Sequence, residues 1–334
     1  MKSTAILFDE RYLLHDPGLW HPECPDRLRA VKKSIDSVRE SQPKTLIDLK
    51  PRLATDEEMS LIHDSEHVYK VKQTAGHYVD LDPDTHASPQ TWEAASLAVG
   101  GLLECVDHVM SQKVKNAFAF VRPPGHHAER ERAMGFCFFN NVAIAAEYAL
   151  RQHNAKRIVI MDYDVHHGNG TQHSFYNRAD VFYISTHRYP FYPGTGARRE
   201  EGSGIGKGYT LNVTFDGGEG DEEYLKSFDQ EIIPAINAYK PDLILVSAGY
   251  DAHHDDPLGG MEVTATGFGM MHQKLLDAAQ RHCGGKLVSV LEGGYSLEGL
   301  EESVTTCLRN MIDTEITPPI SMCDERRRNL LSKD

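Results

Sequence analysis

The densest group of metal-binding side chains in the chain lies within residues 158–170, IVIMDYDVHHGNG. Its first four residues are too few for a helix and rich in branched side chains, which predicts a strand buried on both faces of a parallel sheet. Alternate side chains of extended backbone share one side, so Asp162, Asp164 and His166 are expected to converge on one centre. The alternative, an acidic turn that solvates the strand end, is less favoured because histidines adjoin it.

Three other polar groups also follow short apolar runs. The bend made by Pro-Pro-Gly before His126 and His127 is rigid, and histidine is the side chain best suited to proton transfer near neutral pH. Asp251 follows another apolar run, in the same relation to it as Asp164 to its own. Tyr295 follows Glu-Gly-Gly, where its hydroxyl could donate to an oxyanion.

Together these residues indicate a metal-assisted amide hydrolase. Zinc takes nitrogen and oxygen ligands and keeps one position open for water, which Asp164, His166 and Asp251 would allow. The metal would acidify that water, His126 or His127 would accept its proton, and Tyr295 would stabilise the oxyanion of the attacked carbonyl. This chemistry requires no nucleophilic serine or cysteine.

The elements that must position these groups are five apolar runs ending near residues 121, 161, 184, 247 and 291. Each is followed at once by glycine with histidine, aspartate, serine or tyrosine, and helical segments fill many of the intervals. Parallel strands would bring all five polar groups to one sheet edge. We therefore expect one α/β domain over residues 1–312, followed by a tail or packing arm over residues 313–334.

Composition narrows the class of protein. The chain has 334 residues, 40% hydrophobic and 25% charged, and no apolar run near the roughly 20 residues that span a bilayer. No secretory signal is evident, so a cytoplasmic location and no membrane partner are expected. A net charge of −14 opposes non-specific binding to nucleic acid. The six cysteines are scattered, so a metal would be held by histidine and aspartate, and no glycine cluster fits a dinucleotide site.

Five motifs, in this order, resemble the zinc-dependent deacetylases of the histone deacetylase superfamily, class II members most of all. They are PPGHH (123–127), GFCFFN (135–140), DYDVHHGNG (162–170), SAGYD (247–251) and EGGY (292–295). The resemblance runs from about residue 5 to about residue 311. It implies the arginase–deacetylase fold, a single domain whose mainly parallel sheet of about eight strands is flanked by helices.

The resemblance also implies roles for individual residues. Asp164, His166 and Asp251 would hold the zinc ion, and His127 would be the general base with His126 as its electrostatic partner. The other catalytic positions would be those that orient the two histidines and the one that stabilises the oxyanion, namely Asp162 beside His126, Asn169 beside His127, and Tyr295. A tyrosine at 295 implies an active deacetylase, because class IIa relatives have histidine there and deacetylate poorly.

Further positions follow from the resemblance for the substrate and for potassium. The acyl-lysine tunnel and its rim would use Asp84, Gly135, Phe136, Tyr192, Leu258, Gly293 and Gly294. A first potassium ion would be held at Asp162, Ser185 and Thr186, with oxygens of Asp164 and His166. A second would be held at Phe175, Arg178, Val181 and Tyr224. The loop at residues 15–27 would lie on the rim.

The substrate remains open between two classes with the same chemistry. Relatives specific for acetylated polyamines have a glutamate at the tunnel mouth, where this chain has Leu258. An apolar wall accepts a methylene stem, whereas a carboxylate would pair with a second ammonium. We therefore expect an acetylated lysine protein or peptide as substrate, with acetylpolyamine as the alternative. A non-catalytic acyl-lysine binding protein and a two-manganese ureohydrolase are less favoured, and a homo-oligomer is possible.

Overall fold

The computed structural model describes residues 3–43 and 45–312. Within them, parallel strands form one eight-stranded sheet in the order β2-β1-β5-β10-β9-β6-β7-β8. The strands are β1 (Thr4–Leu7), β2 (Leu46–Leu49), β5 (Asn116–Ala119), β6 (Ile158–Asp162), β7 (Val181–Arg188), β8 (Thr210–Phe215), β9 (Leu243–Ala248) and β10 (Leu287–Leu291). A separate antiparallel hairpin joins β3 (Val79–Asp82) to β4 (Thr85–Ala87).

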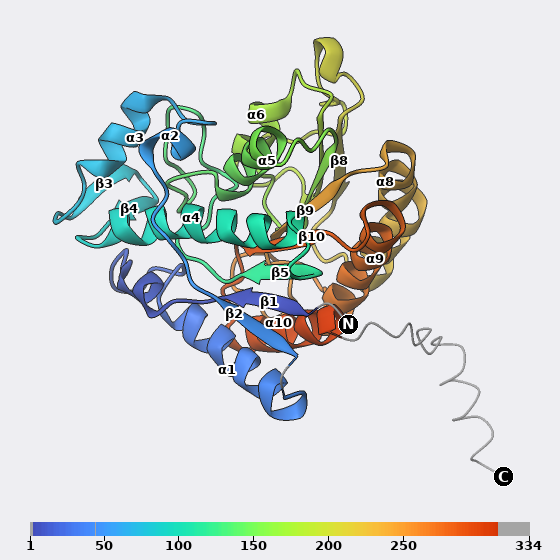
Figure 1. Ribbon diagram of the computed structural model, residues 1–334, viewed down its shortest axis with the longest axis horizontal. Coiled ribbons are helices and arrows are strands. Elements are labelled where there is room, and N and C mark those ends of the chain that lie inside the picture. The colour runs from blue at the N-terminus through green and yellow to red at the C-terminus, as the bar shows by residue number, and fades with distance from the viewer. Residues whose placement is uncertain (1–2, 44, 313–334) are drawn as a thin grey trace.

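Helices cover both faces of the sheet (Figure 1). In Figure 1, α4 and α5 lie on one face, and α1, α9 and α10 pack together on the other. The α-helices are α1 (Asp26–Ser41), α2 (Asp56–Met59), α3 (Ser65–Lys72), α4 (Thr91–Met110), α5 (Asn141–Gln152), α6 (Asn169–Phe175), α7 (Asp221–Ser227), α8 (Ile233–Tyr239), α9 (Ala265–Cys283) and α10 (Leu297–Ile312). Shorter helical segments are η1 (Glu10–Leu14), η2 (Gly204–Gly206) and η3 (Phe228–Ile232), the last a π-helix between α7 and α8.

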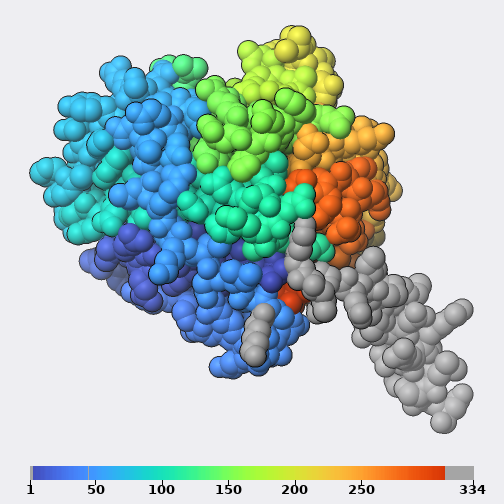
Figure 2. Space-filling view, viewed as in Figure 1, coloured from blue at the N-terminus to red at the C-terminus, as the bar shows by residue number. Residues whose placement is uncertain are grey.

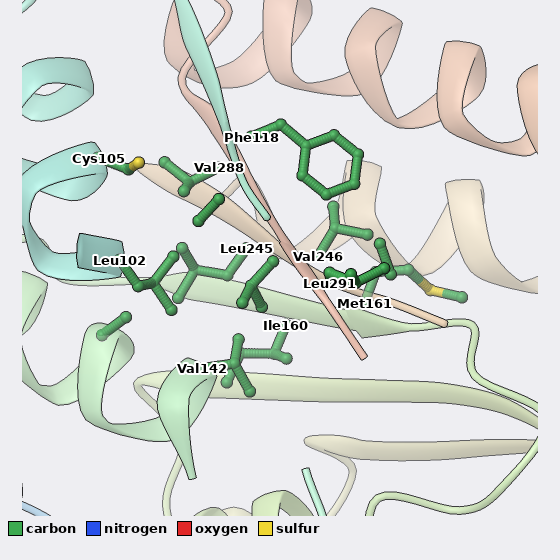
Figure 3. Close-up of a cluster of buried hydrophobic side chains, with 14 of the residues drawn as sticks. Leu102, Cys105, Phe118, Val142, Ile160, Met161, Leu245, Val246, Val288 and Leu291 are labelled. Atoms are coloured by element: carbon green, nitrogen blue, oxygen red, sulfur yellow. The ribbon is translucent and has the colours of Figure 1, made fainter. Parts of the chain in front are cut away.

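The core forms where side chains of the central strands alternate between the two faces. Ile160 and Leu245 are register partners on β6 and β9, and both point toward the layer that holds Val142 of α5 (Figure 3). Their neighbours Met161 and Val246 point to the opposite face. Each such side chain contributes about 1.5–3 kcal/mol when it is fully buried, so this layer makes the strand ends a rigid platform for the site.

The structure confirms the predicted α/β architecture. The five apolar runs are β5, β10, β9, β6 and β7, which are consecutive neighbours in the sheet. Since they are parallel, their carboxyl ends and the polar residues that follow lie along one edge. In Figure 2 the described chain forms one continuous body on the visible face. Among the described residues no helix is long and apolar enough to cross a membrane.

Three expectations need correction or fall outside the description. β7 runs to Arg188 rather than ending near residue 184, so Ser185 and Thr186 lie within a strand. Asp84, whose neighbours Pro83 and Pro89 favour irregular backbone, lies in the turn of a regular β3–β4 hairpin. The predicted tail, residues 313–334, lies outside the described residues.

Candidate active site

A group of two aspartates and one histidine lies at the carboxyl ends of β6 and β9. Asp164 and His166 follow β6, and Asp251 follows the neighbouring β9. One ligand atom from each of the three lies within 4.8 Å of the others. His166 Nδ1 is 3.1 Å from Asp164 Oδ1 and 3.0 Å from Asp251 Oδ2. The structure thus brings together the three residues predicted as metal ligands.

These donor atoms fit a tetrahedral metal ion. Zinc bound to nitrogen and oxygen at about 2.0 Å would hold two ligand atoms roughly 3.3 Å apart along a tetrahedral edge, close to the spacings around His166 Nδ1. Backbone groups orient the carboxylates, since the Val165 N–H donates to Asp251 Oδ1 at 2.8 Å and the Gly293 N–H donates to Asp164 Oδ2 at 2.8 Å. The chemistry and spacing of the set therefore suit a divalent cation.

The charges of this group also favour a cation. Asp164 and Asp251 are almost fully buried. Burial and the charge of Asp164 raise the pKa of Asp251 to about 7. Burial alone would lower the pKa of His166, but its hydrogen bonds to Asp164 and Asp251 outweigh this and raise it to about 10. Two buried carboxylates beside one imidazole leave negative charge that a dication would neutralise.

The two adjacent histidines of the Pro-Pro-Gly bend have hydrogen-bond partners of different charge. Their rings lie 4.0 Å apart between centroids. His126 Nδ1 lies 3.0 Å from Asp162 Oδ2, whereas His127 Nδ1 lies 2.7 Å from Asn169 Oδ1. One imidazole therefore faces a carboxylate and the other faces a neutral amide, as the resemblance implied.

These partners separate the pKa values of the two histidines. Burial would lower the pKa of His126, but the charges of Asp162 and Asp164 outweigh it and raise the pKa well above its ordinary value. Burial and then the charge of His126 lower the pKa of His127 well below its ordinary value. His127 is therefore neutral, as a proton acceptor must be.

Asp162 does not join the metal-binding group. Strand alternation predicted that it would converge with Asp164 and His166, but β6 ends at Asp162 and the backbone then leaves extended geometry. Its Oδ2 instead faces His126 Nδ1 and accepts a hydrogen bond from the Tyr183 hydroxyl at 3.0 Å. The structure therefore places Asp162 behind His126 and outside the three-residue group.

A buried glutamate fixes the bend that carries the histidines. Glu292 Oε2 accepts from the N–H groups of Gly125 at 2.6 Å and His126 at 3.2 Å. Its Oε1 accepts from the Ser247 hydroxyl at 3.0 Å. A Cβ on Gly125 would lie 2.6 Å from the Asn141 nitrogen, so the bend packs too closely for any larger residue. Glu292 was recognised as part of the EGGY motif, but no role was predicted for it.

A cavity of about 140 Å³ opens onto these groups. Phe136 and Tyr295 form one part of its wall, with ring centroids 6.0 Å apart and nearly perpendicular planes. Tyr192 lies on the side of His127, 5.1 Å away between ring centroids. The lining residues are Asp84, His127, Gly135, Phe136, His166, Tyr192, Leu258 and Tyr295.

The hairpin turn supports the Phe136 wall. Asp84 Oδ1 accepts from the Gly135 N–H at 3.0 Å, and the Thr85 hydroxyl accepts from the Phe136 N–H at 3.1 Å. Gly135 and Phe136 both have positive φ, 58° and 68°. A Cβ on Gly135 would lie 2.4 Å from the His127 ring, so only glycine permits this approach.

Asp256 connects two segments of the cavity wall. Its polar neighbours in the sequence, His253, His254 and Asp255, are typical of a solvated loop, but the Asp256 side chain is buried and only 7% exposed. Its Oδ2 accepts from the N–H groups of Tyr295 at 2.6 Å and Ser296 at 3.2 Å. Its Oδ1 accepts from Leu258 at 2.9 Å and Gly259 at 3.2 Å. Tyr295 and Ser296 lie about forty residues further along the chain, so no local sequence pattern indicates this contact.

Gly293 and Gly294 do not line the cavity, although they were predicted to bind substrate. Gly293 lies against the metal-binding group, where a Cβ would be 2.3 Å from Asp251 Oδ2 and 2.6 Å from Asp164 Oδ2. The Gly294 carbonyl accepts from Arg27 Nε at 2.6 Å. The small size of Gly293 therefore allows close packing behind the metal-binding group.

A buried charge cluster beneath Tyr295 was not predicted. Glu23, Arg27 and Arg122 are fully buried, and Glu23 Oε1 accepts from Arg122 at 2.5 Å and from Arg27 at 3.0 Å. The Arg27 guanidinium lies 4.9 Å from the centre of the Tyr295 ring. In the sequence only Glu23 and Arg27 belong to the predicted rim loop, and an i,i+4 Glu–Arg pair on a helix is usually a surface pair. The cluster instead anchors that loop under the cavity.

The two predicted potassium sets differ in outcome. Asp162 and Ser185 are register partners on β6 and β7, and the Thr186 hydroxyl lies 3.5 Å from the Asp162 carbonyl oxygen. These residues are close together, and potassium binding there stays a prediction.

The second set is not brought together as a whole, because Tyr224 lies apart from Val181. It comprised Phe175, Arg178, Val181 and Tyr224. Tyr224 stacks on Phe215, 4.1 Å between ring centroids, and Phe215 is the register partner of Arg188 at the carboxyl end of β7. Val181 begins β7 at the other end. Seven residues of strand cover roughly 23 Å, so Tyr224 cannot share a small ion with Val181.

Comparisons with known proteins give a consistent result. Residues 21–311 match the family model described as the histone deacetylase domain. The chain is 43% identical over 319 residues to histone deacetylase 15 of Arabidopsis thaliana, covering 93% of this chain and 57% of that protein. It is 41% identical over 299 residues to a probable deacetylase of Archaeoglobus fulgidus, covering 89% of this chain and 82% of the relative.

A solved structure matches as well. The crystal structure titled HDA15 HD domain superposes with a TM-score of 0.89 at 43% sequence identity, covering 93% of this chain and 90% of that chain. The likeness therefore extends over most of the chain.

Proposed function

The chain belongs to the histone deacetylase family and contains a deacetylase hydrolase domain, and on that premise we propose that it removes acetyl groups from the ε-amino group of lysine in proteins or peptides. One observation carries the proposal. His127, His166 and Tyr295 line the same cavity, with Asp164 and Asp251 behind His166. A proton acceptor, a metal-binding group and a hydroxyl donor thus face one small space.

Zinc is the metal that this donor set suits best. Asp164, His166 and Asp251 would hold it, and it would supply Lewis-acid polarisation of the amide carbonyl and acidification of water. The remaining chemistry belongs to the chain's own side chains.

His127 would act as the general base. Its Nδ1–H donates to Asn169, so its Nε2 carries the lone pair that accepts the proton of the attacking water. When the C–N bond breaks, the same nitrogen would return that proton to the leaving lysine amine. His126, held by Asp162, would keep its positive charge close to the negative charge that develops.

Tyr295 would stabilise the oxyanion. Burial raises the pKa of Tyr295 well above its ordinary value, so the hydroxyl stays protonated and can donate to the former carbonyl oxygen. Asp256 holds the Tyr295 backbone, and the Arg27 guanidinium lies over its ring. Preorganised donors of this kind need no rearrangement during the reaction.

The shape of the cavity favours a lysine chain. Phe136 and Tyr192 supply aromatic surface for a methylene stem, and Leu258 contributes an apolar wall. Asp84 adds an acidic group to the lining. Among the described residues that line the cavity, Asp84 is the only carboxylate. No other lining residue could pair with the second ammonium of a polyamine.

A paired steady-state assay tests this proposal. The zinc-loaded protein would be given an acetyl-lysine peptide and acetylspermidine, with Asp251→Asn as the blank. We expect turnover of the peptide with the higher kcat/KM, and none in the blank. Preference for acetylspermidine would keep the mechanism but overturn the substrate assignment. Absence of turnover on both substrates would contradict the proposed activity.

Substituting the cavity wall should shift the substrate preference. Leu258→Glu places a carboxylate beside the tunnel, where it can pair with a distal ammonium and where it removes apolar contact from a lysine stem. We expect kcat/KM for acetylspermidine relative to the peptide to rise about tenfold, equivalent to roughly 1.4 kcal/mol. Leu258→Gln has a similar shape without the charge and is the matched control. An equal ratio in both variants would remove Leu258 as a specificity determinant.

A further inference from the structure

The amide of Asn169 is held between His127 and a glutamate that the mechanism above does not use. Asn169 Oδ1 lies 2.7 Å from His127 Nδ1. On its other side, Asn169 Nδ2 donates to Glu129 Oε1 at 2.5 Å and to the His127 carbonyl oxygen at 3.3 Å. Glu129 belongs to none of the five sequence motifs.

These partners permit one orientation of the amide. An ionised carboxylate and a backbone carbonyl only accept hydrogen bonds, so the NH₂ group of Asn169 must face Glu129 and the His127 carbonyl. A reversed amide would place Oδ1 against Glu129 Oε1 at the present 2.5 Å spacing. It would also present an NH₂ group to His127 Nδ1, and that nitrogen would then have to be the acceptor.

The orientation of the amide decides which nitrogen of His127 carries the proton. In a neutral imidazole, one nitrogen is a donor and the other an acceptor, and the hydrogen bond at one determines the state of the other. With Oδ1 facing it, Nδ1 keeps the proton and Nε2 has the free lone pair. With the amide reversed, Nε2 would be protonated and could not accept a proton from water.

We propose that Glu129 is a positioning residue that fixes the Asn169 amide and so keeps His127 in the Nδ1–H tautomer. The proposal rests on the proposed function, in which His127 Nε2 is the base. Glu129 does not line the cavity, so it acts only through Asn169. The two oxygens of an aspartate at position 169 would be equivalent, so its orientation would not matter. The amide of Asn169 has two different orientations, and Glu129 selects one of them.

Helix α6 explains why this contact is stable. Asn169 is its first residue and His173 lies one turn later, so both side chains reach Glu129 from one helix face. His173 Nδ1 lies 2.8 Å from Glu129 Oε1 and 3.0 Å from Oε2. The hydrogen bond to Glu129 raises the pKa of His173. The histidine thereby holds the carboxylate against Asn169.

The first test is Glu129→Gln. Glutamine keeps the shape but offers both a donor and an acceptor, so Asn169 can reverse. We expect kcat to fall roughly 10- to 100-fold, as when a residue that orients an active-site ligand is lost, with KM nearly unchanged. Glu131→Gln is the matched control, since Glu131 is exposed two residues along the same segment. Equal kcat in the two variants would overturn the proposal.

A second test exchanges the hydrogen-bond donor and acceptor between positions 129 and 169. Asn169→Asp alone opposes its carboxylate to Glu129, and kcat should fall. In the double variant Glu129→Gln with Asn169→Asp, glutamine can donate to one aspartate oxygen while the other accepts from His127 Nδ1. The double variant should therefore recover at least tenfold in kcat over Asn169→Asp. A double variant slower than both single variants would show a purely structural role and would overturn the proposal.

The tautomer can be read without any turnover. Long-range ¹⁵N–¹H spectra of histidine-labelled, zinc-loaded protein distinguish the two neutral tautomers, and His127→Gln identifies the signal. We expect Nδ1–H in the wild type and an Nε2–H population in Glu129→Gln. Unchanged spectra in Glu129→Gln would refute the inference. If the tautomer shifts but the wild type cleaves no acetyl-lysine, the proposed function fails while the inference stands.

Discussion

Replacing His127 with glutamine is expected to lower kcat on an acetyl-lysine peptide about 10²- to 10⁴-fold, the range for losing a positioned general base. The physical reason is the separation of the two histidine pKa values. His126 faces Asp162 and holds its proton, whereas His127 faces the neutral Asn169 amide and is neutral. Glutamine fills similar space but cannot accept and return a proton.

Steady-state kinetics would measure this effect, with zinc content and thermal midpoint as controls for folding. KM should change little, because the cavity walls made by Phe136 and Tyr192 are retained. A His127→Gln variant that keeps bound zinc and more than a tenth of wild-type kcat would show that another group is the base. His126 could not take over as the general base, because its raised pKa keeps it protonated. The mechanism would then need revision.

Replacing Tyr295 with phenylalanine is expected to lower kcat roughly 10²- to 10³-fold, as when one oxyanion donor is removed. The ring would keep its place beside Phe136 and under the Arg27 guanidinium, so only the hydroxyl is lost. Tyr224→Phe is the matched control, since that buried ring stacks on Phe215 and is not among the cavity residues. Similar kcat values for the two variants would remove Tyr295 from the mechanism.

The site residues that could be predicted from the sequence are those that directly follow a parallel strand. Asp164, Asp251 and His127 each follow a short apolar run, and parallel strands carry such residues to one edge. Residues far apart in the chain could therefore be grouped without knowing any contact. The same rule placed Tyr295 there, after the last strand.

Prediction failed where a side chain's partner is a distant group. The Asp256 carboxylate is buried because it accepts backbone N–H groups near Tyr295, and nothing in its local sequence distinguishes it from a solvated loop residue. Glu23 is likewise buried because Arg122, about a hundred residues away, pairs with it. Strand alternation misplaced Asp162, since it assumed extended backbone beyond the end of β6.

The most direct test of the account is a zinc titration of metal-free wild-type protein and of Asp251→Asn, with bound metal and peptide deacetylation measured in the same samples. Asp164, His166 and Asp251 form a set suited to a single ion. We predict that wild-type activity rises in proportion to zinc up to one ion per chain, and that Asp251→Asn gains neither tight binding nor activity. Full activity without metal, or activity that requires two ions per chain, would contradict the account.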